Sequence, residues 1–91
     1  EISGTQKAYW VSNLGRVKSY QGYEAIIMKP RIENGYERID IVYPTGRMSK
    51  MVHTLVGNEF LPMPASMEYQ IHHKNFNSLD NRLSNLTYML K

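Results

Sequence analysis

The chain contains no cysteine, and this absence removes two common ways of stabilising a small domain. Without a thiol among its 91 residues, it can form neither a disulfide framework nor a zinc site with cysteine ligands. No apolar run approaches the roughly 20 residues that cross a bilayer, and no signal peptide opens the sequence. We therefore expect a cytoplasmic protein with no membrane partner. Internal repeats and low-complexity tracts are absent as well.

Charge and apolar content are both moderate. The apolar fraction is 42% and there are seven tyrosines, which indicates a folded chain with a modest core. The net charge of +3 favours a polyanionic partner, although a mild basic excess is also common on ordinary soluble surfaces. The length suits one domain, or one small domain with an appended module.

Turn signals divide the first half into short strands. Asn34-Gly35 predicts a hairpin turn, and residues 36–43 then alternate as a half-buried strand should. Further short strands are expected at residues 8–11 and 15–20, with a covered strand at Tyr23–Met28. Together these segments predict a twisted antiparallel sheet or meander.

The apolar period changes in the second half. Val52, Leu55, Val56 and Phe60 predict a short amphipathic helix from about Lys50 to Phe60, with Ser49 as its cap. Two short strands, Tyr69–His73 and Leu86–Leu90, are expected on either side of a polar loop. We expect the large aromatic residues Trp10 and Phe60 to anchor the core.

The polar loop combines two adjacent histidines, His72 and His73, with four asparagines. Imidazole both ligates divalent metals and titrates near neutral pH, so this pair can offer a metal ligand and a general base. Asparagine amides can hold a loop, or one tautomer of an imidazole, in place. The alternative interpretation is a polar surface turn without chemistry.

Three segments in one order carry a family resemblance. The block from Ile71 to Leu86 resembles the core of HNH nucleases, with His72-His73, Asp80-Asn81 and Asn85-Leu86 at the motif positions. Residues 51–62 look like the helix that precedes this core in phage homing enzymes. Residues 9–19 are similar to a Tyr-x-Val-Ser-Asn-x-Gly-Arg-Val-x-Ser module that accompanies HNH homing endonucleases and is associated with DNA binding. An unrelated β-rich interaction domain would require all three matches to be chance.

The resemblance implies specific roles. His72 would bind the divalent metal, expected to be Mg²⁺ or Mn²⁺, with Zn²⁺ or Ni²⁺ as alternatives. His73 would take a proton from water, and the resulting hydroxide would attack a phosphodiester of double-stranded DNA. Asn85 would orient the catalytic loop and fix His73 by hydrogen bonds. His53, on the predicted helix, is interpreted as a packing residue that hydrogen-bonds to the backbone or to a neighbouring strand.

The resemblance also implies an α+β architecture in two parts. Residues 1–50 would form a small antiparallel β-sheet module that binds DNA, and residues 51–91 a ββα-metal HNH core. The last helix of that core, with the remaining metal ligand, would lie beyond Lys91. We therefore expect this chain to bind metal weakly and to cut DNA poorly. The alternative function is a non-catalytic DNA-binding module that keeps a degenerate HNH scaffold.

Contacts with DNA are expected from basic and aromatic side chains on the sheet and around the loop. Arg16, Lys18 and Tyr20 share one face of a predicted strand, so they can line one surface. Further candidates for phosphate contacts flank this face or the site: Arg38, Arg47, Lys50, Lys74 and Arg82. For each of these residues, a solvated surface side chain is the alternative.

Overall fold

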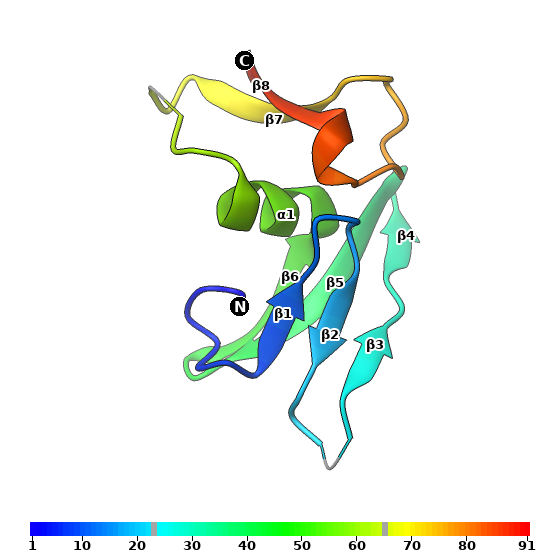
Figure 1. Cartoon of the computed structure of the whole chain (residues 1–91), viewed down its shortest axis with the longest axis vertical. Helices are drawn as coiled ribbons and strands as arrows, with labels where there is room; N and C mark the ends of the chain where they lie inside the picture. Colours follow the sequence, from blue (N-terminus) through cyan, green and yellow to red (C-terminus); the bar gives the residue numbers. More distant parts are fainter. Residues whose placement is uncertain (23, 65) are drawn as a thin grey trace.

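The computed structural model describes residues 1–22, 24–64 and 66–91, and these form antiparallel sheets around a central helix (Figure 1). The first sheet joins β1 (Tyr9–Val11), β2 (Val17–Ser19) and β3 (Ile26–Met28). The second joins β4 (Arg31–Glu33), β5 (Tyr36–Tyr43) and β6 (Gly46–Met51). The third pairs β7 (Tyr69–His73) with β8 (Leu86–Leu90), which follows the 3₁₀ helix η1 (Leu83–Asn85). The predicted α+β class is confirmed.

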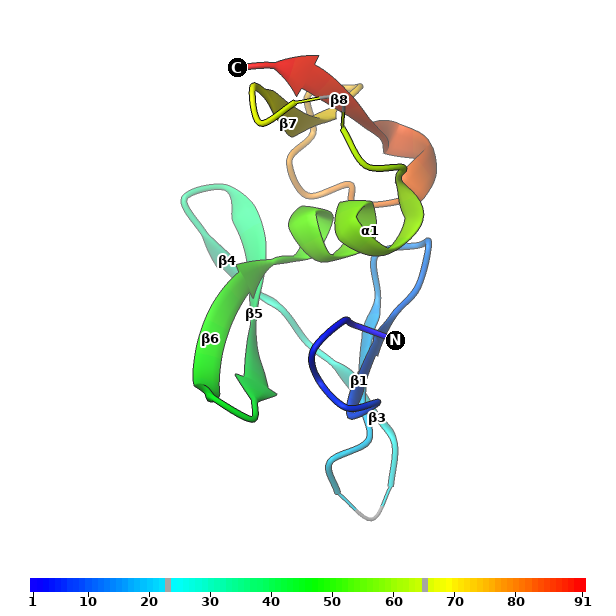
Figure 2. The same ribbon diagram turned by 90° about the vertical axis from the view of Figure 1, so that its left-hand side faces the viewer.

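The central helix α1 (Val52–Phe60) lies between the two N-terminal sheets and the β7–β8 hairpin (Figure 2). It contacts β1, β5 and β6 on one side and β7, β8 and η1 on the other. Its inward positions follow the predicted period, since Val52, Leu55 and Val56 are buried. The helix therefore connects the sheets to the hairpin that carries the histidine pair.

The helix begins at Val52 rather than at Lys50, and the predicted cap was wrong. Met51 occupies the N-cap position, and no side chain caps the helix. Ser49 is still within β6, where it pairs with Asp40 and where its hydroxyl accepts hydrogen bonds from Arg31 and Arg38. Ser49 is therefore part of strand β6 and does not cap the helix.

The second sheet follows its sequence pattern closely. Asn34 and Gly35 have φ values of 53° and 81°, as a two-residue hairpin turn with positive φ at both positions requires. Along β5, Ile39 and Ile41 are buried and their neighbours are more exposed, which confirms the predicted alternation. The sheet therefore has an inner face against the core and an outer face toward solvent.

One hydrophobic core crosses the predicted boundary at residue 50. It contains these residues from both sides: Ile2, Tyr9, Val11, Val17, Ile39, Ile41, Val52, Leu55, Val56 and Leu86. The prediction that Trp10 and Phe60 anchor this core was wrong, because their side chains are 42% and 43% exposed. Strand alternation turns Tyr9 inward and Trp10 outward, so Tyr9 is the buried aromatic of β1.

The third strand was also predicted to be covered, and this was wrong. Ile26 and Ile27 are 60% and 58% exposed, because β3 is an edge strand that pairs only with β2 among the described residues. The Tyr23 end of the predicted strand lies outside the described residues. No helix in the described ranges is long and apolar enough to cross a membrane.

Candidate functional site

The β7–β8 hairpin places the histidine pair at the end of a strand. His72 lies opposite Thr87 and His73 opposite Leu86. His73 is buried, with 6% of its surface exposed, whereas His72 is half-buried and meets the Phe76 ring edge-on at a centroid distance of 5.2 Å. Both histidines nevertheless border one open hollow of about 300 Å³, together with Tyr36, His53 and Gln70. The strand end thus places both imidazoles at the border of one hollow.

Asn85 braces the loop that follows the pair. Its side-chain oxygen accepts from the Asn75 backbone N–H at 3.1 Å, and its amide nitrogen donates to the Asn75 side chain and the Asp80 carbonyl at 3.0 and 2.9 Å. The Asn85 carbonyl also accepts from the Lys74 backbone N–H at 2.7 Å. The buried Asn85 therefore ties both ends of the loop together. The expected direct hydrogen bond from Asn85 to His73 is not formed, so that part of the prediction was wrong.

Asn81, rather than Asn85, holds the His73 ring. The Asn81 side-chain oxygen lies 2.7 Å from His73 Nε2, and its amide nitrogen donates to Glu37 Oε1 at 2.9 Å. Asn81 and His73 are both buried. Sequence reasoning placed Asn81 in the motif without a contact, and it missed Glu37. The one available signal was that Glu37 shares the inward face of β5 with Ile39.

His53 reaches His73 from the helix side. The two ring centroids are 4.9 Å apart in an edge-on arrangement, and the Tyr36 ring lies 5.6 Å from His53 and 6.3 Å from His73. Among the described residues, His53 Nδ1 is the fully buried side-chain nitrogen without a hydrogen-bond partner. This nitrogen does not make the hydrogen bond to the backbone or to a neighbouring strand that was expected of His53. Burial, and to a smaller extent the neighbouring His73, lowers the pKa of His53 to about 4. His53 is therefore neutral near pH 7.

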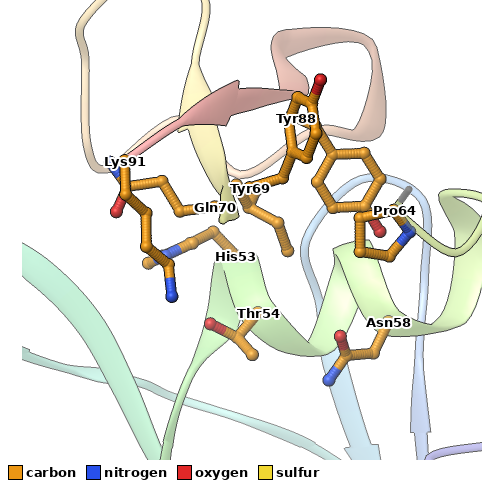
Figure 3. A pocket seen from close by; sticks show the side chains of 9 residues that line it. His53, Thr54, Asn58, Pro64, Tyr69, Gln70, Tyr88 and Lys91 are labelled. Atoms are coloured by element: carbon orange, nitrogen blue, oxygen red, sulfur yellow. The ribbon is translucent and has the colours of Figure 1, made fainter. Parts of the chain in front are cut away.

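A second hollow, of about 320 Å³, lies between α1 and the hairpin (Figure 3). Thr54 and Asn58 border it from the helix, and Tyr69, Tyr88 and Lys91 border it from the other side. His53, Gln70 and Ile71 border both this hollow and the one that the histidine pair lines.

Arg82 forms an ion pair with Asp80 within the loop. Its guanidinium donates to the two carboxylate oxygens of Asp80 at 2.8 and 2.7 Å. The hydrogen bond from Arg82 lowers the pKa of Asp80 to about 2. A phosphate at this position would compete with Asp80 for the guanidinium, whereas Lys74 is exposed beside the same loop.

The first sheet brings three of the predicted DNA-contact residues together. Arg16 and Lys18 border an open, mainly apolar hollow of about 300 Å³ with Trp10 and Ile27. The Lys18 ammonium lies 5.2 Å from the centre of the Tyr20 ring. Cations, an exposed aromatic ring and apolar surface are thus combined on one face of this sheet.

The second sheet separates the other predicted contacts. Arg38 and Arg47 are on its outer face, where the Arg38 guanidinium donates to the hydroxyl and carbonyl of Ser49. Lys50 pairs with Ile39 on the opposite face, and its ammonium lies 5.8 Å from the Tyr43 ring. Arg38, Arg47 and Lys50 therefore do not share one surface.

The described residues offer few metal ligands. In the part of the chain that the structure describes, no three His, Cys, Asp or Glu side chains are grouped so that they could hold an ion together. His72 is the half-buried imidazole beside the hollow, while His73 Nε2 is bound by Asn81. Of this pair, His72 is therefore the residue that could offer a single imidazole ligand to an ion.

Two comparisons relate this fold to homing endonucleases. The NUMOD4 motif, which is associated with homing endonucleases, matches residues 1–42. A solved structure described as DNA binding and cleavage by the HNH homing endonuclease I-HmuI matches with a TM-score of 0.85 and 28% sequence identity. The match covers 99% of this chain and 51% of that chain, so this chain spans about half the length of the solved one. No curated protein matches the chain.

Proposed function

We propose that the chain is part of a metal-dependent HNH-type DNA endonuclease of the homing or nicking type, which hydrolyses phosphodiester bonds in duplex DNA. One observation supports this above the others. His72 and His73 border an open hollow, and the loop behind them is tied by buried amides of Asn81 and Asn85. A general base needs access to its substrate and a fixed ring, and this arrangement offers both.

His73 is proposed as the general base. Its Nε2 is engaged by Asn81, so Nδ1 is the nitrogen left to take a proton from water. The water, once deprotonated, attacks the scissile phosphate. Asn85 keeps the loop closed behind the ring, which holds His73 beside the hollow. The surrounding side chains of Tyr36 and His53 limit the movement of the imidazole.

His72 is proposed to contact the divalent ion, with Mg²⁺ or Mn²⁺ expected and Zn²⁺ or Ni²⁺ as alternatives. When bound, such an ion supplies Lewis-acid stabilisation of the charge that develops on the phosphate and on the departing sugar oxygen. His72 can turn its ring toward the hollow because it is half-buried rather than enclosed.

DNA is proposed to lie across the first sheet and the polar loop. Arg16 and Lys18 would bind phosphates, Tyr20 would support Lys18, and the exposed Lys74 would hold the backbone beside the site. Arg38 and Arg47 belong to another face, and Arg82 would first have to leave Asp80, so we expect smaller contributions from them.

A non-catalytic DNA-binding module is the second candidate. The face with Trp10, Arg16 and Lys18 favours it, because that face lies within the residues matched by the NUMOD4 motif and needs no metal. On this alternative, the histidine pair would be a retained structural feature.

A plasmid-nicking assay with Mn²⁺ in protein excess separates the two candidates. We expect the unsubstituted chain, the parent, to nick DNA slowly. His73→Ala and the more conservative His73→Gln should both lose nicking while their DNA affinity stays unchanged. Equal nicking by the parent and a folded His73→Gln protein would refute the role of His73. Salt-sensitive DNA binding without nicking by the parent would favour the binding module.

A further inference from the structure

Glu37 and the histidine site are far apart in the sequence but connected through one side chain. Glu37 lies on β5, inside the segment that the NUMOD4 motif matches, whereas Asn81 and His73 belong to the hairpin. Asn81 donates to Glu37 Oε1 at 2.9 Å and contacts His73 Nε2 at 2.7 Å. Asn81 is 4% exposed and His73 is 6% exposed, so water has little access to the contact between them. The contact between Asn81 and Glu37 is partly buried.

The chemistry of Glu37 decides which way the Asn81 amide points. A carboxylate only accepts hydrogen bonds, so the NH₂ end of Asn81 must face Glu37. The oxygen end then faces His73 Nε2, and an oxygen without a hydrogen can only accept. In the neutral ring, His73 must therefore carry its proton on Nε2 and leave Nδ1 unprotonated.

A second contact from the N-terminal segment fixes the backbone of Asn81. Gly15 has a φ of 82°, and a Cβ there would lie 3.0 Å from both the Cβ and the carbonyl oxygen of Asn81. Next to it, the Asn13 carbonyl accepts from the Leu83 backbone N–H at 2.7 Å. The 12–16 turn thus packs directly on the chain at Asn81, and only glycine leaves room for this approach.

We propose that the N-terminal segment positions the histidine site, with Glu37 as the positioning residue that sets the tautomer of His73 through Asn81. The Gly15 turn holds the Asn81 backbone, and Glu37 orients its amide. The rings of Tyr36, also on β5, and of His53 lie beside the His73 ring, with centroid distances of 6.3 and 4.9 Å. On this account residues 1–42 do more than contact a partner, because they also determine which nitrogen of His73 is free.

The significance for catalysis rests on the proposed function, but the tautomer itself does not. Nδ1 of His73 forms no hydrogen bond with another described residue and is not among the fully buried unpaired atoms. It therefore keeps some accessible surface, and His73 borders the open hollow. If His73 is the base, Glu37 selects the nitrogen that performs this step.

The test is the tautomer of His73, read from long-range ¹H–¹⁵N correlation spectra of the neutral ring in the full 91-residue chain. In the parent we expect a protonated Nε2 and an unprotonated Nδ1. Glu37→Lys replaces the acceptor with a donor, so the Asn81 amide should turn over and His73 should carry its proton on Nδ1. Glu37→Ala removes the acceptor alone and should give a mixture. Glu24→Lys, which makes the same charge change at an exposed position, should match the parent.

Several outcomes overturn the proposal. These are an Nδ1 proton on His73 in the parent, a parent-like spectrum in a folded Glu37→Lys protein, and an unmixed Nε2 tautomer in Glu37→Ala. The nicking assay distinguishes a failure of this proposal from a failure of the proposed nuclease function. If the parent shows the expected tautomer and the expected response to Glu37 but never nicks DNA, only the proposed function fails. If the parent nicks DNA, Glu37→Lys should reduce the rate by at least tenfold while Glu24→Lys does not.

Discussion

Replacing Gly15 with alanine tests whether the N-terminal turn bears on Asn81. Gly15 and Gly4 have nearly the same backbone conformation, with φ values of 82° and 83°. An alanine at either position therefore has a similar left-handed penalty of about 1–2 kcal/mol. At Gly4 the added Cβ meets only the Tyr43 ring at an ordinary 3.7 Å, so Gly4→Ala is a matched control.

The two positions differ in what the new methyl group meets. At Gly15 it would lie 3.0 Å from the Asn81 Cβ and carbonyl oxygen and 3.1 Å from its carbonyl carbon. Two of these are backbone atoms, which cannot rotate away as a flexible side chain can. Overpacking of this kind costs about 1–3 kcal/mol. We therefore expect Gly15→Ala to lower the free energy of unfolding by about 1–3 kcal/mol more than Gly4→Ala does.

Urea denaturation followed by far-UV circular dichroism measures both variants under the same conditions. The linear extrapolation gives the two free energies of unfolding, and an unchanged m-value keeps the comparison valid. Equal destabilisation by Gly4→Ala and Gly15→Ala would refute the argument, because it would show that the turn does not press on Asn81. A shift of the His73 ring resonances in Gly15→Ala alone would support the positioning role.

Three further predictions concern the pKa values of His53 and Asp80 and the salt dependence of DNA binding. The unfolded chain binds a proton at His53 below pH 6.5 and the folded chain only below about 4, so the free energy of unfolding should fall by about 2–3 kcal/mol as the pH drops through this window. His53→Leu should lose this pH dependence in urea titrations. An NMR titration should place the Asp80 pKa near 2, and Arg82→Ala should raise it toward its ordinary value, so that this carboxylate contributes less stability near neutral pH and less is lost as acid is added. DNA affinity should fall with salt, and Arg16→Ala and Lys18→Ala should each reduce the log–log slope by about one.

Local sequence signals predicted the elements that depend on local chemistry. Asn34-Gly35 specified its turn because both residues tolerate positive φ, and the alternation along residues 36–43 gave the inner face of β5. The strands of the hairpin were predicted at Tyr69–His73 and Leu86–Leu90, where the structure has them. Each of these features is determined within a few residues.

Contacts between segments that are distant in the chain could not be predicted from the sequence. Residue type favoured Trp10 as the buried aromatic, but the face of β1 that meets the core contains Tyr9 instead. Ser49 is a good cap by type, but β6 continues past it to pair with β5. In both cases the competing contacts come from segments distant in the chain, and no local pattern records them.

The residues of the candidate site could be predicted from the sequence, but their contacts could be predicted only in part. The family motif identified His72, His73, Asn81 and Asn85 as a group, and the structure does bring them around one loop. The motif could not assign the partner of His73, because two asparagines four positions apart are equivalent as residue types. Glu37 could not be found at all, since its role depends on β5 packing beside the hairpin.

Chemical rescue of nicking tests the role of His73 most directly. His73→Gly removes the imidazole and leaves space beside the hollow, so Mn²⁺-dependent plasmid nicking should be lost. Free imidazole added to that variant should restore part of the rate, while it should leave the parent unchanged. Nicking by His73→Gly at the parent rate without imidazole would contradict the assignment of His73 as the base.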